Sequence, residues 1–332
     1  MKMSRLCLFS LFLGITLLFC GAPSANAAPY PTDGKYRLAL TSGSTGGSWY
    51  AVGAVFSETI KQYLPNCNVT VQVGGGVSNP SLIDSGKMDF GFTYSPALIA
   101  AVAGNAPYGK PLTHLRAIAR MEPCLGVAFA TKSSGITSFE QIRDQKLKVR
   151  MAVPAVGNFG EACASAILKA YGLDYSILKA NGGSVQFVSH PEAADLFRDG
   201  HIDIYICAAG LGHANVTEMC LSREMVFLPV AGEALPYLQK LGYEEDIIPK
   251  GAFTGVTENV PAIVYSAVWL VRDDTPNELA YYFTKCLYEK IGDLAAAYSA
   301  IKERPMDQMP KVYGAPMHPA AEQFYKEVGL LK

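Results

Sequence analysis

The fold is decided by the stretch Leu38-Ala39-Leu40-Thr41-Ser42-Gly43-Ser44-Thr45-Gly46-Gly47-Ser48-Trp49-Tyr50, an apolar run followed by a turn rich in Gly, Ser and Thr. An apolar pattern with helical spacing continues to about Tyr63. Glycines let the chain turn sharply, and the first amides of a helix carry partial positive charge without an internal partner. The stretch therefore predicts a strand, a loop and a helix whose start suits a carboxylate or phosphate. An ordinary connection between strand and helix would use similar residues.

The composition indicates a globular protein with room for two domains. Half of the 332 residues are hydrophobic and 17% are charged, which excludes a largely disordered chain. The formal net charge is −1, and no polybasic run occurs. The balance therefore offers no basic surface for nucleic acid.

The first 27 residues have the pattern of a signal peptide. Lys2 and Arg5 precede an apolar core from Leu6 to Phe19, and Ala25-Asn26-Ala27 forms a small-x-small cleavage site. Acylation of Cys20 is a weaker alternative, because a bulky residue precedes that cysteine. We expect an exported protein cleaved after residue 27, which loses two positive charges and so moves from −1 to −3.

The chain repeats its pattern after 114 residues. A first set of elements is predicted as strands Tyr36–Thr41, Val69–Val73 and Met88–Phe92 with helices to Tyr63, over 80–85 and from Pro96. The same order recurs with a helix Phe159–Tyr171 and a strand Ile202–Ile206. The identities under this shift are Gly46/Gly160, Val71/Val185, Gln72/Gln186, Leu82/Leu196, Gly86/Gly200 and Asp89/Asp203. They are few, but the matching order of elements favours two related halves.

Two α/β lobes joined by two crossover segments, with a ligand cleft between them, follow from this repeat. Alternating strands and helices form parallel sheets whose ligand sites lie at the carboxyl ends of the strands. The crossovers are predicted over Leu115–Ala130 and Phe253–Val271, the latter as strands 262–265 and 268–271, and helices over 276–294 and 319–330. Lobe one then takes residues 28–122 and 258–332, and lobe two takes 123–257. A single undivided sheet, or loops 44–50 and 156–159 on different sides, would contradict this prediction.

Several motifs together resemble the TAXI family, the solute-binding receptors of tripartite ATP-independent periplasmic (TRAP) transporters. They are Gly46–Tyr50, Val73–Asn79, Ser85–Phe92 and Met317–Glu322. The resemblance covers the whole mature chain. It implies a type II periplasmic-binding-protein fold, a periplasmic location and a small carboxylate ligand. It also implies a membrane permease as partner, with no cofactor, no metal and no catalysis.

The resemblance also implies which loops face the ligand. Backbone amides and the hydroxyls of Ser44, Thr45 and Ser48 are the candidates for one carboxylate. The full set of candidate ligand-binding residues is Ser44, Thr45, Ser48, Trp49, Tyr50, Gly76, Ser78, Asn79, Thr93, Tyr94, Ser95, Gly157, Asn158, Phe159, Ala209 and Gly210. We further expect Asn79 to cap the short helix that begins at Pro80.

Two departures from the family pattern bear on the ligand. Where the family commonly has Gln-Ser-Asp after the third strand, this chain has Tyr94-Ser95-Pro96. Where it commonly has Gly-Ser-Gly-Thr in lobe two, this chain has Ala155–Phe159. The missing aspartate could have paired with an ammonium group, so a hydroxy-, keto- or dicarboxylate is favoured. A receptor for glutamate or another amino acid is the alternative.

An enzyme on the same fold is a further alternative, with Cys207 near the cleft as nucleophile, although no paired histidine is apparent. Asp89 and Asp203 suggest an acid–base pair, but each starts a strand at the end opposite the ligand loops. We assign them capping or turn roles. His213 is a loop histidine that could face the cleft. The six cysteines left after the leader permit disulfides or can be buried small hydrophobes.

Overall fold

The computed structural model describes residues 29–45, 47–303 and 305–332. The predicted signal peptide over 1–27 lies outside these residues, as does Gly46, one member of the repeat identities. The chain from Thr32 to Lys332 forms one compact unit.

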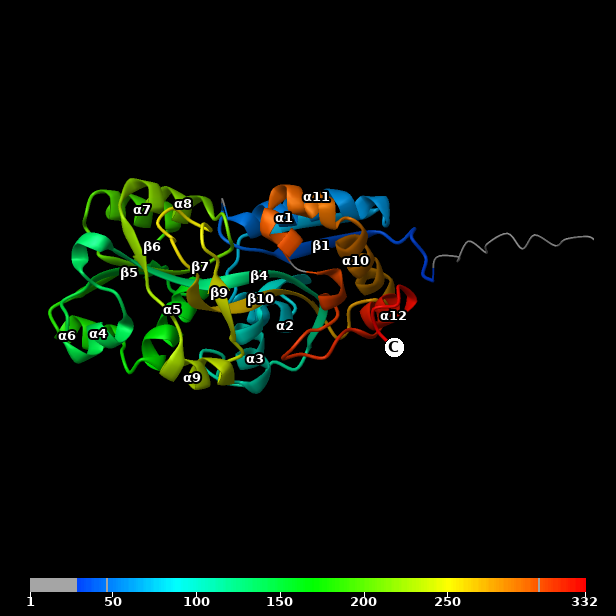
Figure 1. Ribbon diagram of the computed structural model, residues 1–332. Coiled ribbons are helices and arrows are strands. Elements are labelled where there is room, and N and C mark those ends of the chain that lie inside the picture. Colours follow the sequence, from blue (N-terminus) through cyan, green and yellow to red (C-terminus); the bar gives the residue numbers. More distant parts are fainter. Residues whose placement is uncertain (1–28, 46, 304) are drawn as a thin grey trace, which may run out of the picture. The chain divides into compact units, whose positions relative to one another are not determined.

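Lobe one is built on three parallel strands (Figure 1). These are β1 (Tyr36–Thr41), β2 (Cys67–Gln72) and β3 (Phe90–Tyr94), in the order β2-β1-β3. The helices that follow them are α1 (Ser48–Thr59) with the 3-10 turn η1 (Ile60–Gln62), α2 (Asn79–Asp84) and α3 (Ser95–Ala103). The strand, loop and helix of the opening stretch therefore form as the sequence predicts.

Lobe two repeats this arrangement. Its parallel strands are β5 (Arg150–Pro154), β6 (Ser184–Val188) and β7 (Ile204–Ala209), in the order β6-β5-β7. Its helices are α4 (Phe139–Asp144), α5 (Phe159–Ala170), α6 (Tyr175–Ala180), α7 (His190–Arg198), α8 (Ala214–Ser222) and α9 (Leu235–Lys240), with 3-10 turns η2 (Lys132–Ser134) and η3 (Gly232–Ala234). The central strand of each lobe is thus followed by a 12-residue helix, α1 or α5.

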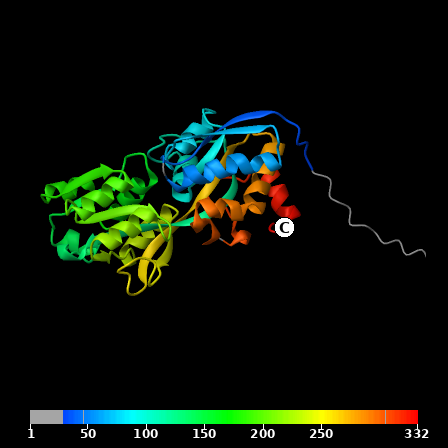
Figure 2. The same cartoon turned by 90° about the horizontal axis from the view of Figure 1, so that it is seen from above.

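Two long antiparallel strands, β4 (Leu115–Thr131) and β10 (Val260–Arg272), connect the lobes. β10 pairs with β3 through Ala267–Val271, and β4 pairs with β7 through 125–130. Short strands β8 (Met225–Phe227) and β9 (Glu244–Ile248) extend them in lobe two. Figure 2 shows the blue and orange segments of lobe one gathered on one side of these strands and the green segments of lobe two on the other.

The hydrogen-bonded ladder is therefore continuous, in the order β2-β1-β3-β10-β4-β7-β5-β6. Each lobe keeps its own parallel group, and only the crossover strands join the two groups. Of the predicted lobe boundaries, 122/123 lies within β4 and 257/258 lies just before β10, and both remain predictions. The two strands expected over 262–265 and 268–271 are one strand with register shifts near Ser266 and Trp269.

Strands β3 and β7 begin two residues later than the sequence predicts, for the same reason in both lobes. Asp89 precedes β3, and its Oδ2 accepts a hydrogen bond from the Ala39 backbone amide at 2.7 Å. Asp203 precedes β7, and its Oδ2 accepts from the Arg150 amide at 3.0 Å. Each aspartate therefore bonds to the neighbouring strand, β1 or β5, rather than capping a helix or closing a turn as expected, and the repeat duplicates this contact.

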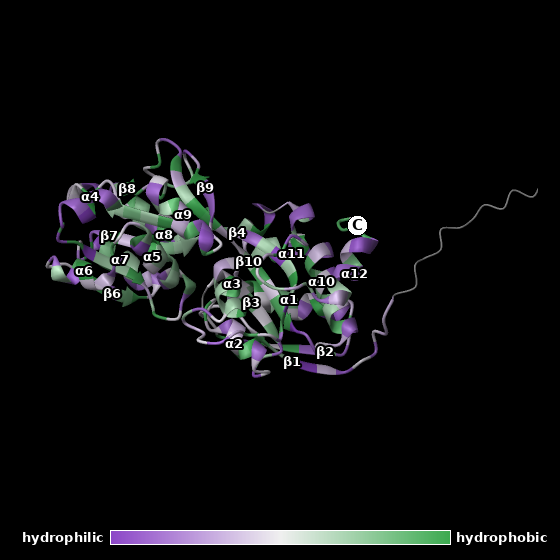
Figure 3. Cartoon of the chain, turned by 90° about the horizontal axis from the view of Figure 1, so that it is seen from below, coloured by the Kyte–Doolittle hydropathy of each residue, from purple (hydrophilic) through white to green (hydrophobic). Residues whose placement is uncertain are grey.

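The C-terminal segment packs against lobe one. Helix α11 (Ile291–Ala297) contacts α1, and α12 (Pro319–Glu327) contacts α10 (Asn277–Glu289), with 3-10 turns η4 (Ser299–Glu303) and η5 (Met306–Gln308) between them. Phe56 of α1 packs on Trp269 and Phe283 with ring centroids 4.7 and 5.3 Å apart. Figure 3 shows hydrophobic residues concentrated along the inner strands and hydrophilic ones on turns and outer helix faces.

All six cysteines of the described chain are buried and form no disulfide: Cys67, Cys124, Cys163, Cys207, Cys220 and Cys286. They occupy core positions as small hydrophobic side chains, the second of the two alternatives that the sequence left open. Within the described ranges, no helix combines the length and apolar character that crossing a membrane requires.

Candidate functional site

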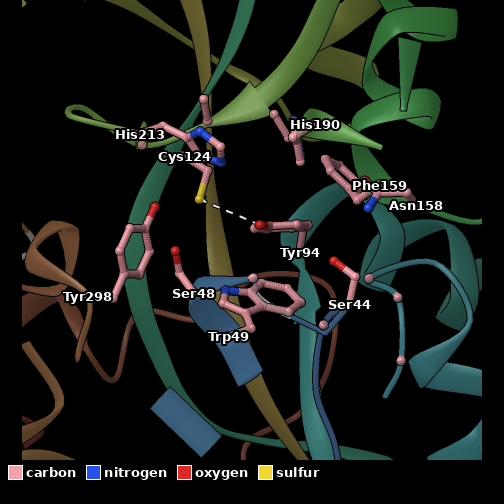
Figure 4. A pocket seen from close by; sticks show the side chains of 18 residues that line it. Ser44, Ser48, Trp49, Tyr94, Cys124, Asn158, Phe159, His190, His213 and Tyr298 are labelled. Carbon is pink, nitrogen blue, oxygen red and sulfur yellow. Dashed lines mark hydrogen bonds between the residues drawn. The ribbon is translucent and has the colours of Figure 1, made fainter. Parts of the chain in front are cut away.

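One pocket lies where the two lobes meet, and both line it (Figure 4). Its lining residues are Gly43, Ser44, Gly47, Ser48, Trp49, Gly74, Gly75, Gly76, Tyr94, Cys124, Asn158, Phe159, His190, Ala208, Ala209, Gly210, His213 and Tyr298. Every parallel strand of both lobes contributes a residue from its carboxyl end, which is where open α/β sheets bind ligands. The loops 44–50 and 156–159 therefore converge on the same cavity.

Trp49 forms a fixed wall on the lobe-one side. Its indole lies 4.4 Å from the ring of Tyr94 and 5.1 Å from that of Phe92, centroid to centroid. Its Nε1 donates a 2.8 Å hydrogen bond to Oε1 of buried Glu122. The ring contacts and this hydrogen bond together set the orientation of the indole.

Asn79 holds the lobe-one loops from behind the pocket and is not part of its lining. Its Oδ1 accepts hydrogen bonds from Thr41 Oγ1 and the Gly75 amide, both at 2.9 Å. Its Nδ2 donates to the carbonyls of Ser42 and Phe92, both at 2.8 Å. The expected capping role is wrong, because Asn79 is the first residue of α2 and its side chain is fully used between strands.

The two lobes touch at the glycine loop after β2. A Cβ atom on Gly75 would lie 2.8 Å from the Gly157 carbonyl oxygen, and one on Gly76 would lie 3.1 Å from Cβ of Phe159. The ring of Phe159 packs 4.5 Å from that of Tyr94. Only glycine allows this close approach of the two backbones.

On the lobe-two side, the pocket is lined by the starts of three helices. Asn158 caps α5, and its Oδ1 accepts a 2.8 Å hydrogen bond from the Gly160 amide. His190 is the first residue of α7, and His213 immediately precedes α8. Together with α1 from lobe one, four helices of at least nine residues begin at this cavity.

His190 and His213 lie against each other in the pocket wall, with ring centroids 4.9 Å apart. The Nδ1 atom of His190 lies 2.8 Å from the Tyr205 hydroxyl oxygen. Burial and the neighbouring His213 lower the pKa of His190 to about 4, and burial lowers that of His213. Both rings are therefore neutral at pH 7.

Nδ1 of His213 is buried and has no hydrogen-bond partner among the described residues. A buried ring nitrogen without a partner costs about 1–3 kcal/mol, so its presence in a pocket wall points to a polar group from the pocket side.

Cys124 and Tyr298 complete the cavity. Cys124 Sγ lies 3.8 Å from the Tyr94 hydroxyl oxygen. A Cβ atom on Gly210 would lie 2.3 Å from the Tyr298 hydroxyl. Position 210 therefore requires glycine, because any side chain there would clash with this tyrosine. Burial raises the pKa of Tyr94 and Tyr298 well above its usual range, and both hydroxyls stay protonated.

No Asp, Glu, Lys or Arg belongs to the part of the described chain that lines the pocket. The polar surface consists of hydroxyls, histidine rings, the Asn158 amide and backbone groups at helix starts. Such a surface presents hydrogen-bond donors and partial positive charge without a fixed ionic partner. Within the described ranges, no group of three or more His, Cys, Asp or Glu side chains has a geometry that could hold a metal ion.

Nine of the residues predicted from the sequence line the pocket: Ser44, Ser48, Trp49, Gly76, Tyr94, Asn158, Phe159, Ala209 and Gly210. Thr45 and Ser78 are exposed outside it, and Tyr50 and Gly157 do not contribute to it. Asn79, Thr93 and Ser95 are buried behind it. The Thr93 hydroxyl donates to the Gly76 carbonyl at 2.6 Å, and Ser95 Oγ accepts from the Ser266 amide at 3.2 Å.

Sequence reasoning did not assign the pocket residues Gly43, Gly74, Cys124, His190 and Tyr298. Gly47, Gly75 and Ala208 lie within the loops 44–50, 75–79 and 208–210 that the resemblance gives as ligand-facing, and His213 was a loop histidine that could face the cleft. His190 follows β6 as Gly74 follows β2, so the repeat could have identified it. Tyr298 reaches the site through the packing of the C-terminal segment, for which the sequence has no local signal.

Cys207, the suggested nucleophile, does not reach the pocket. Its side chain is fully buried in the lobe-two core, and burial raises the pKa of its thiol above the usual range. A thiol that stays protonated and enclosed is a poor nucleophile. Cys207 is therefore not placed to act as a nucleophile on a ligand in this pocket.

Comparisons with known proteins agree with this architecture. The NMT1-like family matches residues 40–329. The structure of MatC from Rhodopseudomonas palustris with bound malate is 11% identical, covers 90% of this chain and 99% of its own, and has a TM-score of 0.53. XAC2383 from Xanthomonas citri bound to chloride ion is 11% identical, covers 88% and 95%, and has a TM-score of 0.51.

These likenesses are too low in identity to show more than the fold. They confirm the α/β architecture of two lobes joined by two crossover strands, which the repeat in the sequence predicts. The family match spans both lobes and all the pocket-lining loops. The chain belongs to the NMT1-like family.

Proposed function

We propose that this protein is an extracytoplasmic solute-binding receptor that captures a small organic acid between its lobes. The observation that carries the proposal is the convergence of four helix starts on a pocket without an acidic side chain in its described lining. Each helix start carries unpaired amides and roughly half a positive charge. Four of them around one cavity favour an anion.

The available donors suit carboxylate oxygens. Ser48 is the first residue of α1, Ser44 lies in the loop before it, and Asn158 stands at the start of α5 across the cavity. Hydrogen bonds to an ionised group contribute about 1.5–3 kcal/mol each. A few such bonds from both lobes would hold a carboxylate and favour a closed arrangement of the lobes.

The cavity volume of about 100 Å³ limits the ligand to a small molecule. It is well below the roughly 300–1,000 Å³ of pockets that bind drug-sized ligands. The bound malate in the fold relative MatC has the size and charge that this cavity would accept.

The lining also favours an acid without an amino group. An α-ammonium group needs a carboxylate or several acceptors, and the described lining offers no Asp or Glu. Tyr94 stands near the place where the TAXI pattern has an aspartate. A hydroxy-, keto- or dicarboxylate is therefore a better candidate than glutamate.

Delivery to a membrane permease of a TRAP transporter, after export through the predicted signal peptide, completes the proposal. It rests on the TAXI resemblance of the motifs in the loops after β1 and β2 and before β3. Membership of the NMT1-like family is compatible with it.

Isothermal titration calorimetry of the mature protein tests the binding role. We expect binding of 2-hydroxyglutarate, malate or 2-oxoglutarate, and at least tenfold weaker binding of glutamate. Mass spectrometry should recover the ligand unchanged after incubation. Tight glutamate binding without binding of the other acids contradicts the ligand class, and turnover of the ligand contradicts the receptor role.

A charge placed at the start of α1 tests the site itself. Ser48→Asp keeps a good residue for a helix start but adds a negative charge inside the pocket. We expect at least a hundredfold loss of affinity with an unchanged melting temperature. Ser81→Asp, on an exposed position of α2, is the matched control and should bind as wild type does. Unchanged binding by Ser48→Asp would place the ligand elsewhere.

A further inference from the structure

Two histidines from separate helix starts meet in the lobe-two wall of the pocket (Figure 4). His190 begins α7 and His213 precedes α8, and their rings are 4.9 Å apart at an angle of 52°. The other three histidines of the described chain, His114, His201 and His318, lie outside this pocket. The pairing therefore places two titratable groups at the ligand.

The hydrogen-bond partners of the pair are asymmetric. Tyr205 is fully buried, and burial raises the pKa of its hydroxyl, which stays protonated. The O–H of Tyr205 can donate to His190 Nδ1 over 2.8 Å, which leaves the His190 proton on Nε2. His213 Nδ1 has no such partner among the described residues, although it is buried in the wall.

We propose that His190 and His213 form a proton-linked anion subsite, in which an oxyanion of the ligand accepts a hydrogen bond from His213 and its binding adds one proton to the pair. This inference rests on the proposed function and extends it to a second negative charge on the ligand. The hydroxyls and amides of lobe one then hold one carboxylate, and the histidine pair holds the other.

The described lining of the pocket around the pair contains no Asp, Glu, Lys or Arg side chain. The titratable groups that face the pair are the Tyr205 hydroxyl from β7, the Cys124 thiol from β4 and the hydroxyls of Tyr94 and Tyr298 across the pocket. Buried Glu122 lies behind this lining, where it accepts from Trp49 Nε1 and contributes to the raised pKa of Tyr94 and Tyr298. The three tyrosines stay neutral because burial raises the pKa of each. Glu192, the acid nearest to His190 on α7, is exposed.

The direction of the pH effect follows from these contacts. In the free protein, burial and the mutual effect of the two rings lower the pKa of His190 to about 4. An anion bound beside the pair stabilises its charged form and raises that pKa. Affinity should therefore increase as the pH falls from 8 towards 5.5, with one proton at most taken up, because both rings are too close to be charged together.

Calorimetry with 2-hydroxyglutarate tests the inference, since this acid stays a dianion throughout that range. The apparent enthalpy is measured in buffers of different ionisation enthalpy at pH 6.5, and the affinity at pH 5.5, 6.5 and 8. We expect uptake of between about 0.3 and 1 proton per ligand and at least a tenfold gain in affinity between pH 8 and pH 5.5. The monoanion 2-hydroxybutyrate should show less than a twofold change.

Variants of the two histidines test whether the proton taken up on ligand binding is bound by this pair. His213→Gln keeps a donor without a charge, so it should lose the proton uptake and the gain in affinity at low pH, whatever its affinity at pH 8. His190→Gln should behave in the same way. His201→Gln removes an exposed histidine outside the pocket and is the control that should retain both effects.

The outcomes separate this inference from the receptor proposal. The proton-linked subsite is contradicted if 2-hydroxyglutarate binds without proton uptake, or if the uptake persists in His213→Gln and His190→Gln. Either result would leave the receptor proposal intact. If no acid of the panel binds at any pH, the receptor proposal and the subsite fall together.

Discussion

The two walls of the pocket are built in contrasting ways. On the lobe-one side, Trp49 is stacked on Phe92, packed against Tyr94 and hydrogen-bonded to Glu122, and Asn79 joins the loops behind it. On the lobe-two side, the half-buried rings of His190 and His213 line the pocket, and Nδ1 of His213 has no partner among the described residues. The lobe-one wall is therefore held by hydrogen bonds and ring contacts, whereas the lobe-two wall carries two titratable rings and a buried nitrogen without a partner among the described residues. We call the lobe-one wall with Trp49 and Asn79 the rigid side of the pocket, and the lobe-two wall with His190 and His213 the responsive side.

The largest effect should come from breaking the rigid side. Asn79→Ala removes four hydrogen bonds and leaves buried groups of Thr41, Ser42 and Phe92 without their partner. We expect the free energy of unfolding, measured by urea titration, to fall by about 3–5 kcal/mol, because each buried unpaired group costs about 1–3 kcal/mol. Exposed Ser78→Ala is the neighbouring control and should change it by less than about 1 kcal/mol. A loss below 1 kcal/mol for Asn79→Ala would mean that the loops are held by other contacts.

This asparagine also shows where sequence reasoning ends. The glycine loop after β2 and the helix beyond it were predicted because they depend on local turn chemistry and periodicity. Whether Asn79 faces the ligand or the strands behind the loop depends on its distance from Ser42 and Phe92, which only the folded chain defines. The same limit explains why Thr93 and Ser95 were predicted as ligand residues although their side chains support the backbone.

The repeat carried the prediction further than single motifs could. It predicted two related lobes, the resemblance added Asn158 and Phe159 as ligand-facing residues of the second, and the structure brings them into one pocket with Ser44. It did not supply the histidines, because a lone histidine in a loop is usually a surface residue. Their meeting depends on the packing of α7 beside α8, which lies beyond local pattern.

His190, on the responsive side, should make the free energy of unfolding depend on pH. The pKa of His190 is about 4 in the folded protein, below its ordinary value of 6.5, so the unfolded chain binds more protons between these values. Stability is therefore fully present above pH 6.5 and is lost as the pH falls towards 4. We expect wild type to lose on the order of 2 kcal/mol more than His190→Gln between pH 7.5 and 4.5 in urea titrations. Parallel curves for the two proteins would show that His190 does not titrate differently on unfolding.

A smaller effect is expected from removing the hydrogen bond between Trp49 and Glu122 on the rigid side. Trp49→Phe preserves an aromatic ring on Tyr94 and Phe92 but removes the N–H that donates to Glu122. We expect a loss of about 2 kcal/mol in the free energy of unfolding, because a buried carboxylate loses one of its donors. Trp269→Phe, in the lobe-one core away from the pocket, is a comparison that reports loss of ring volume without this hydrogen bond. If both variants preserve ligand affinity, the indole N–H serves orientation and not binding.

The smallest effect is expected at the end of the lobes opposite the pocket. There, both lobes have an aspartate that accepts a hydrogen bond from a backbone amide. Asp89 accepts from the Ala39 amide, and Asp203 accepts from the Arg150 amide and also pairs with the Arg150 guanidinium. Asp89→Asn and Asp203→Asn should each lower the free energy of unfolding by about 1 kcal/mol, since these contacts are partly solvated. The two sites share no partner, so the double variant should lose the sum of the two within about 0.5 kcal/mol. A coupling above 1 kcal/mol would show that the turns before β3 and β7 communicate through the crossover strands, and the two lobes would then be less independent than their hydrogen bonds indicate.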